Sequence, residues 1–233
     1  MLTDLLTVAV LALVGTRLVS VAARAARSDG MRRRIVTILR GLRPRHFLMV
    51  PPVLAVVITV ASLLVQVPGL SFGWWTALGG QGNPVVGSTD RTAGTPLEWI
   101  VPLVFVVLLL PVLSLFAERE EMMFRQGAEH WSWRHRVYKC LQFGLVHALI
   151  GIPIGVALAL SIGGAYFTWA YLRVYRKVEA RAAAGPQGTG LDVEPEAEAE
   201  ALLESTRCHT AYNLSIVALL LVYLIAVAVG AAT

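Results

Sequence analysis

The stretch Glu120-Glu121-Met122-Met123-Phe124-Arg125 follows an apolar run that extends from Trp99 to Phe116. A charged side chain in or beside a membrane segment costs roughly 2.5–3.5 kcal/mol on insertion scales, so it marks a candidate functional site. Arg125 follows Glu121 by four residues, which places both side chains on one face of a helix. The stretch therefore predicts a membrane helix that carries a polar site at its end.

The whole chain has the composition of a membrane protein. It has 233 residues, of which 56% are hydrophobic and 15% charged, and its mean hydropathy is +0.66. These values predict a single integral membrane domain over residues 1–233 instead of a soluble fold. The net charge of +5 does not indicate a nucleic-acid partner, because the arginines cluster in short segments between apolar runs and set the topology.

The apolar runs predict an all-α, polytopic bundle of about six spans. The run over 141–175 would form about 50 Å of helix, well beyond a hydrocarbon core of about 30 Å, so we expect two spans with a break at 151–153. The six predicted spans are about 4–23, 47–67, 97–116, 141–150, 154–175 and 207–229. Eight arginines between positions 24 and 45 give the strongest positive-inside signal, which predicts a multi-pass cell-membrane protein with both termini outside. The composition, rich in Arg, Ala and Val, indicates a bacterial plasma membrane.

The segments between these spans carry further expectations. A short interfacial helix is expected around 35–39, and an outer loop over 68–96 with Trp74 and Trp75 at the interface. We expect a flexible acidic cytoplasmic loop over about 178–206, with at most a short helix after Pro195. The motif-bearing core is then about 97–230. Cys140 and Cys208 are expected to be reduced. The three histidines outside the motifs are expected to be solvated: His46, His130 and His135.

Two more polar motifs lie on predicted spans. Phe143 and His147 form an FxxxH pattern, and His209 and Asn213 form an HxxxN pattern. The predicted topology places both motifs, together with the two glutamates, in the cytoplasmic half of the bilayer. Intramembrane polar groups face one another or water, so the packed spans are expected to bring these residues around a water-filled cavity.

These residue types suit a hydrolase that attacks an amide bond directly with water. A partly buried glutamate can act as a general base, and a histidine beside it can orient the attacking water. His209 and Asn213 share a helix face, and one such donor to an oxyanion is worth about 3–4 kcal/mol in the barrier. Taken singly, Arg125 is more simply half of an ion pair with Glu121, Phe143 is packing, and each histidine could be a hydrogen-bonded structural residue. The set carries more information than any of its members.

The order of the three motifs resembles the CPBP intramembrane proteases, the group of CAAX prenyl endopeptidases and bacteriocin-processing or immunity (Abi) proteins. The resemblance covers about Leu113 to Tyr223. The interval between the second and third motifs is longer than is usual in the family, because of the acidic segment.

The resemblance implies a role for each motif residue. Glu120 would activate water with His147 as its partner, and Glu121 would support the site, held by Arg125. His209 and Asn213 would form the oxyanion pocket. The resemblance also implies a glutamate mechanism without a metal, so no cofactor is expected, although two histidines and two glutamates would suit zinc by ligand type.

Several functions remain open at this stage. The first is an intramembrane endopeptidase that cleaves a peptide or membrane-protein substrate, prenylated or not, near the cytoplasmic face of the lipid bilayer. The second is a non-catalytic immunity or scaffold protein that binds a partner through the same cavity. A small transporter with Glu120 as a proton site is less favoured, because the sequence has no internal repeat of the kind that transporters often carry.

Overall fold

The computed structural model describes residues 2–73, 94–184 and 193–230, and the regular elements of these segments are all helices. Trp74, Trp75 and most of the predicted outer loop lie outside the described residues. Four helical segments are long and apolar enough to cross a membrane, namely Pro44–Leu64, Leu97–His130, Ile154–Ala183 and Val193–Ala226. They match the second, third, fifth and sixth predicted spans. The all-helical class is therefore confirmed, and among the described residues four of the about six predicted spans have a candidate.

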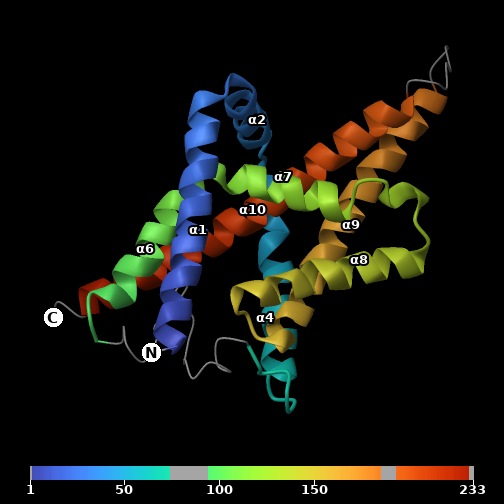
Figure 1. Cartoon of the computed structure of the whole chain (residues 1–233). Helices are drawn as coiled ribbons and strands as arrows, with labels where there is room; N and C mark the ends of the chain where they lie inside the picture. Colours follow the sequence, from blue (N-terminus) through green and yellow to red (C-terminus); the bar gives the residue numbers. More distant parts are fainter. Residues whose placement is uncertain (1, 74–93, 185–192, 231–233) are drawn as a thin grey trace.

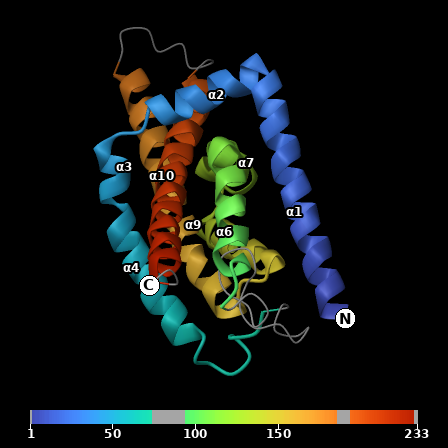
Figure 2. The same ribbon diagram turned by 90° about the vertical axis from the view of Figure 1, so that its left-hand side faces the viewer.

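The N-terminal helices lie at one side of the bundle and across one end of it. α1 (Leu2–Arg27) stands apart from α4 and α10, and α2 (Asp29–Arg40) leads back across the end of the bundle (Figure 2). The Ser28 side chain caps α2 by accepting a hydrogen bond from the Met31 amide. α2 confirms that 35–39 is helical, and its position at the membrane interface stays a prediction. The side chains of residues 2–8 lie outside the described set, so a membrane crossing by α1 stays a prediction.

The second predicted span is interrupted near its start. One residue, Met49, separates α3 (Pro44–Leu48) from α4 (Val50–Leu64). Pro51 and Pro52 occupy the first turn of α4, where their missing amide protons cost little. Because these two prolines lack the amide protons that would continue the hydrogen bonds of α3, a new helix begins beside them. Three large apolar side chains are exposed along α4, namely Val56, Ile58 and Leu63. Such a surface suits an apolar environment such as lipid.

The third predicted span consists of two helices. α6 (Leu97–Leu109) and α7 (Leu113–Phe124) are joined by a single 3-10 turn, η1 (Leu110–Val112), and the chain changes direction there (Figure 1). Pro111 lies in this turn and removes one amide donor from the helix. α7 runs through both glutamates of the first motif, as expected from the sequence. It ends at Phe124 with Arg125 as its C-cap, and Gly127 then adopts a left-handed φ of 80° that turns the chain away.

The break predicted at 151–153 is confirmed. α8 (Trp133–Val146) continues into a 3-10 turn, η3 (His147–Ile150), and α9 (Ile154–Ala183) begins after Gly151, whose φ is 89°, and Pro153. α8 packs antiparallel to α9, with Gly144 against Ala157 and Ser161. α8 is not among the four candidate spans. Three basic residues occupy its first two turns: Arg134, Arg136 and Lys139.

Replacing Gly144 with alanine is expected to destabilise the protein by about 1–3 kcal/mol, because the added Cβ would overpack the α8–α9 contact. That Cβ would lie 2.8 Å from the Ser161 amide nitrogen and even closer to the Ala157 carbonyl, both of which are backbone atoms that cannot turn aside. Gly163→Ala is the matched control, since its Cβ would meet only Phe167 Cε2 at 3.9 Å. Thermal unfolding in detergent micelles measures both, and equal stability of the two variants would contradict the packing argument.

The acidic segment is helical where the structure describes it, which corrects the prediction of a flexible loop over 178–206. α9 continues to Ala183, and α10 (Val193–Gly230) is one helix of 38 residues that starts well before the expected position 207. Ala197 and Ala201 are fully buried against Tyr171 and Tyr175 of α9. These alanines are four residues apart, so they form one small-residue face that two tyrosines cover. Glutamates alternate with these alanines in the sequence, so the segment reads as acidic and its buried face was not predicted.

The two ends of the described chain lie at the same end of the bundle. The first turns of α1 and the last turns of α10 are close to this end in both views (Figures 1 and 2). The projecting ends of α9 and α10 lie toward the opposite end (Figure 1). This arrangement agrees with termini on one side of a membrane, and their placement outside the cell stays a prediction.

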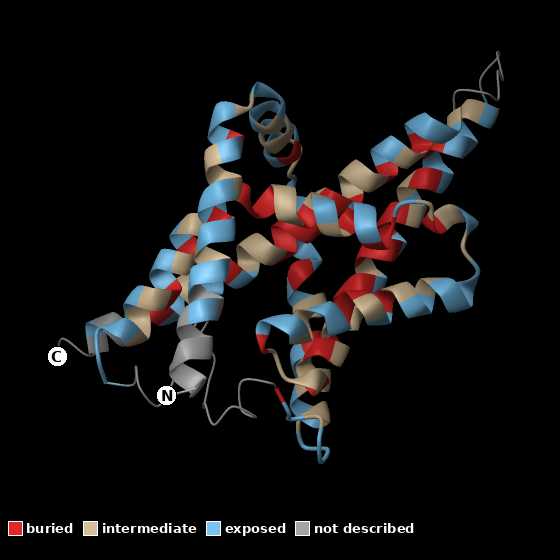
Figure 3. Cartoon of the chain, in the orientation of Figure 1, coloured by how far each residue is buried: buried red, intermediate tan, exposed pale blue. Residues whose placement is uncertain are grey.

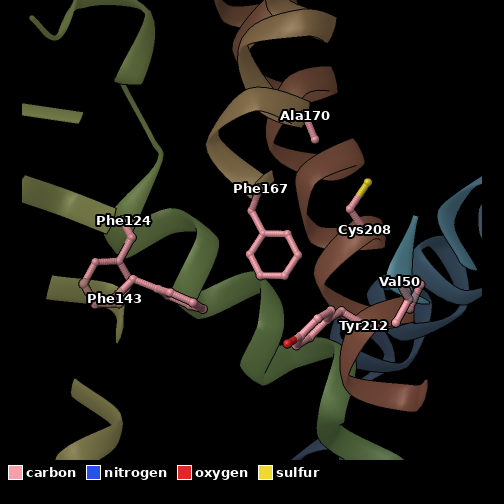
Figure 4. Close-up of a cluster of buried hydrophobic side chains, with 8 residues drawn as sticks. Val50, Phe124, Phe143, Phe167, Ala170, Cys208 and Tyr212 are labelled. Atoms are coloured by element: carbon pink, nitrogen blue, oxygen red, sulfur yellow. The ribbon is translucent and has the colours of Figure 1, made fainter. Parts of the chain in front are cut away.

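Buried residues gather where α7, α8, α9 and α10 meet (Figure 3). One apolar cluster draws on α4 and all four of these helices (Figure 4). Its members are Val50, Phe124, Phe143, Phe167, Ala170, Cys208, Ala211 and Tyr212. Both cysteines are buried and free. This cluster positions the motif residues, because the polar side chains of α7, α8 and α10 lie beside its aromatic rings.

Candidate active site

Glu121 is the centre of the polar cluster and is fully buried. Its Oε1 lies 2.8 Å from His209 Nδ1 and 3.2 Å from Arg125 Nη1, and its Oε2 accepts a hydrogen bond from the Ser205 hydroxyl. A carboxylate can only accept, so the ring nitrogen Nδ1 of His209 carries a proton and donates it to Glu121. Both oxygens of Glu121 are therefore already occupied by partners on α7 and α10.

Arg125 closes α7 and is held on three sides. Its amide donates to the Glu121 carbonyl at 2.8 Å, and its Nη2 donates to the Gly164 carbonyl on α9 at 3.2 Å. The guanidinium carbon lies 4.2 Å from the centre of the Phe143 ring and 5.5 Å from that of Phe167. This aromatic contact compensates a buried cation that has few other partners. The role expected for Arg125, an ion pair with Glu121, is present in the structure.

Phe143 lies between the two histidines of the motifs. Its ring centre is 5.2 Å from that of His147 and 5.5 Å from that of His209, both in edge-on geometry. Phe167 stacks on the other side of His209, with ring centres 4.4 Å apart and planes inclined by 20°. Phe143 and Phe167 are also neighbours within the apolar cluster (Figure 4). The predicted packing role of Phe143 thus includes fixing the orientation of an imidazole.

Glu120 lies in a different environment from its neighbour. Its side chain is 31% exposed, and its Oε2 lies 3.7 Å from His209 Nε2. This oxygen is itself buried and has no hydrogen-bond partner among the described residues. His209 therefore lies between the two glutamates, with Nδ1 on Glu121 and Nε2 toward Glu120. Of the two carboxylates, Glu120 is the one with an oxygen that no described protein group hydrogen-bonds.

His147 and Asn213 are less closely tied to the carboxylates. His147 Nδ1 lies 2.8 Å from the Phe143 carbonyl, to which it donates, so that Nε2 is left free. In the parts of the chain that the structure describes, His147 forms no hydrogen bond or ion pair with Glu120. The Asn213 amide, one turn after His209 on α10, likewise has no hydrogen bond there and is half-buried. The catalytic roles of these two residues stay predictions.

Three residues of the cluster were missed in the sequence. They are Ser205, Phe167 and Gly164. Ser205 precedes His209 by four residues, and this spacing on one helix face was the available signal. Gly164 has no side chain because a Cβ there would lie 2.9 Å from Phe143 Cδ1 and 3.2 Å from Arg125 Nη2. No sequence pattern marks Phe167, since an aromatic residue on an apolar helix is usually packing.

Ser205→Ala is expected to lower the free energy of unfolding by about 1–3 kcal/mol, because a buried carboxylate oxygen loses its donor. Ser215→Ala on the same helix is the control, since its hydroxyl donates only to the Ala211 carbonyl one turn away. Denaturant titration in micelles gives both values. Equal effects of the two substitutions would mean that the Ser205 hydroxyl does not stabilise Glu121.

One group of possible metal-ligand side chains occurs among the described residues, and it lies outside the motifs. Ligand atoms of His46, Glu204 and Cys208 lie within 4.8 Å of one another. His46 Nδ1 accepts a hydrogen bond from the Arg43 amide at 2.9 Å, so Nε2 carries the proton and donates to Glu204 Oε1 at 3.1 Å. Arg45 also pairs with this oxygen, at 2.7 Å. The group is a hydrogen-bonded link between α3 and α10, with no lone pair of His46 directed at a cation.

The buried position of His46 corrects the expectation that it is solvated, since only 2% of it is exposed. The glutamate on α10 that binds it is 158 residues away in the sequence, so no local pattern indicated the contact. His130 agrees with the expectation, because its side chain is 63% exposed, and His135 is exposed as well.

Comparison of the chain with protein-family models, with curated proteins and with solved structures gave no match. The resemblance of the three motifs to the CPBP intramembrane proteases therefore stays a prediction. What the structure itself contributes is the geometry: Glu120, Glu121, Arg125, Phe143 and His209 meet at one place between α7, α8 and α10.

Proposed function

We propose that this chain is an intramembrane endopeptidase that hydrolyses a peptide bond with water activated by Glu120. The observation that carries the proposal is the contrast between the two neighbouring glutamates. Glu121 has every oxygen engaged, whereas Glu120 presents a buried, unpartnered oxygen 3.7 Å from His209 Nε2. A carboxylate of this kind can accept a proton from a water molecule that a second polar group orients.

In the proposed reaction, Glu120 takes one proton from water as the oxygen of that water attacks the substrate carbonyl. The tetrahedral intermediate carries its negative charge on the former carbonyl oxygen. Collapse of this intermediate breaks the carbon–nitrogen bond, and the proton held by Glu120 passes to the leaving amine. A free carboxyl group and a free amino group result, so the atoms of one water molecule are divided between the two products.

His209 is proposed to stabilise the oxyanion in its doubly protonated form. Its Nδ1 proton is donated to Glu121, its ring is fixed by Phe143 and Phe167, and its Nε2 proton is then the one that can be donated to a substrate oxygen. A donor whose position is fixed before the reaction stabilises developing charge without reorganisation. Asn213 lies one turn further along α10 and is proposed to donate to the same oxygen. The free Nε2 of His147 is proposed to help orient the water.

The proposed substrate is a peptide or a membrane protein that is cut near the cytoplasmic face, with or without a prenyl group. The site lies at the end of α7 and in the middle of α10, and the basic residues Arg173, Arg176 and Lys177 lie further along α9 from it, toward the C-terminal end of that helix. Positive-inside topology places those basic residues in the cytoplasm. No cofactor enters the proposed reaction.

Proteolysis in liposomes tests the proposal. Wild type, Glu120→Gln and Glu118→Gln are compared on a fluorogenic panel of prenylated and unprenylated peptides. Glu118 is a matched control, because it lies on the same helix and pairs with Arg34 of α2 outside the site. Cleavage by wild type and Glu118→Gln, with loss in Glu120→Gln, is the expected result. Equal cleavage by all three would show that Glu120 is not the base.

Absence of cleavage by wild type across this panel would favour the alternative, a non-catalytic immunity or scaffold protein. In that case Glu120 and His209 would form a binding surface for a partner. Pull-down of membrane partners by wild type and by Glu120→Gln then separates the two functions, since a scaffold that uses this surface loses its partner with the substitution.

A further inference from the structure

A second region, independent of the proposed active site, lies between α8 and α9. We propose that this groove binds one anionic phospholipid of the cytoplasmic leaflet, with its phosphate on Arg173 and Arg176 and an acyl chain along the groove. The groove encloses about 780 Å³. Sites for small molecules usually measure about 300–1,000 Å³, so the groove is of a size that holds part of a lipid.

The walls of the groove are apolar over most of its length. Val137 and Leu141 line it from α8, and Leu158, Ile162 and Ala165 line it from α9. The α9 residues recur at intervals of four and three, which places them on one face of the helix. Fifteen residues separate Leu158 from Arg173, a rise of about 22 Å along α9. An extended acyl chain can therefore lie along this face within a single leaflet and slightly beyond it.

The charge lies at one end only. Arg136, Arg173 and Arg176 line the groove at the end of α9 that carries the basic residues of the cytoplasmic side. Arg136 is already engaged, since it donates to the backbone carbonyls of Ala128 and Glu129 at 2.9 and 3.0 Å. Within the described segments, neither Arg173 nor Arg176 forms an ion pair with a carboxylate. Two uncompensated cations at the mouth of an apolar groove are complementary to an anionic head with a hydrocarbon tail.

The position of Trp169 supports placing Arg173 at the level of the lipid head groups. Its ring is half-exposed at the groove, and the Arg173 guanidinium carbon lies 5.3 Å from the ring centre. Tryptophan is enriched where the hydrocarbon core meets the head groups. Arg173 and Trp169 thus mark the level at which a phosphate would end and an acyl chain would begin. A soluble anion would find the charge but would leave the apolar wall uncovered.

Native mass spectrometry of the full chain in detergent tests the proposal, with dioleoylphosphatidylglycerol and dioleoylphosphatidylcholine as probes. Wild type is expected to retain the anionic lipid in preference. The double variant Arg173→Gln, Arg176→Gln is expected to weaken this binding by about thirtyfold, since each basic residue near an anionic lipid contributes about 1 kcal/mol. The control is Arg134→Gln with Arg181→Gln, which removes the same charge from α8 and α9 outside the groove and is expected to bind as wild type.

Two further measurements separate a lipid groove from a simpler anion site. Ala165→Phe fills the apolar wall and is expected to weaken binding of the anionic lipid by a similar factor while all arginines remain. Glycerol phosphate without acyl chains is expected not to displace the lipid at equal concentration. Equal loss in the control double variant, unchanged binding by Ala165→Phe, or displacement by glycerol phosphate would each overturn the proposal. These readouts involve no proteolysis, so they are independent of the proposed function.

Discussion

Arg125→Met is expected to lower the free energy of unfolding by about 3–5 kcal/mol, because removal of one member of a buried ion pair leaves the other charge uncompensated. Glu121 would lose the guanidinium at 3.2 Å while remaining fully buried. Methionine is the replacement of choice, since it keeps an unbranched chain against Phe143 and Phe167. Denaturant titration in detergent micelles, followed by circular dichroism, measures the change.

Arg34→Met is the control for this prediction. Arg34 pairs with Glu118 where the two side chains are 37% and 15% exposed, and such pairs contribute about 0–1 kcal/mol. A second variant isolates the charge effect from the loss of packing. Glu121→Leu added to Arg125→Met removes both charges and is expected to recover part of the lost stability. If the double variant is less stable than Arg125→Met alone, the buried ion pair is not what the arginine provides.

Glu120→Gln is expected to lower kcat by about 10²–10⁴-fold, the usual contribution of a general base, while leaving the free energy of unfolding within about 0.5 kcal/mol of wild type. The side chain is partly exposed and makes no hydrogen bond among the described residues, so the fold loses little. Steady-state cleavage in liposomes gives the first value, and micelle denaturation gives the second.

Glu121→Gln is the matched comparison at the next position and separates the two glutamates. It leaves Arg125 buried without its counter-charge, so a loss of stability of about 3–5 kcal/mol is expected together with the loss of activity. The proposal thus requires one glutamate whose loss is kinetic and a neighbour whose loss is structural. Equal destabilisation by both substitutions would contradict this division and would remove the argument for Glu120 as the base.

The sequence predicted that the motif residues lie close together, but it did not predict the hydrogen bonds that each side chain makes. Charged residues that end or interrupt apolar runs must find partners, and this requirement alone brought Glu121, Arg125 and His209 together. The break at 151–153 followed from a different argument, the excess length of the apolar run together with its glycine and proline. Neither argument could show that His147 Nδ1 bonds its own helix at Phe143, because that choice depends on where the ring turns at the end of α8.

Other features escaped because they depend on contacts between distant segments. Ser205 and Phe167 are ordinary residues in sequence. The packing of α10 on α7 brings Ser205 to Glu121, and the packing of α9 on α10 brings Phe167 to His209. The predicted start of α10 was too late because the many glutamates before position 207 indicated a solvated loop. The alanines between them form the face that packs on α9. The fourth predicted span has no matching candidate, since its helix begins earlier, at Trp133, and includes three basic residues.

The continuity of α10 gives the molecule a mechanical property. Its 38 residues form about 57 Å of helix, nearly twice the thickness of a hydrocarbon core. Ser205 and His209 belong to this rod, whereas Glu120 and Glu121 belong to α7. A force that lifts the Ala197–Ala201 face from Tyr171 would tilt the rod and change the 3.7 Å separation of His209 from Glu120. The projecting end of α10 and the part that carries His209 are therefore one rigid body, so a displacement of the first reaches the second without an intervening hinge.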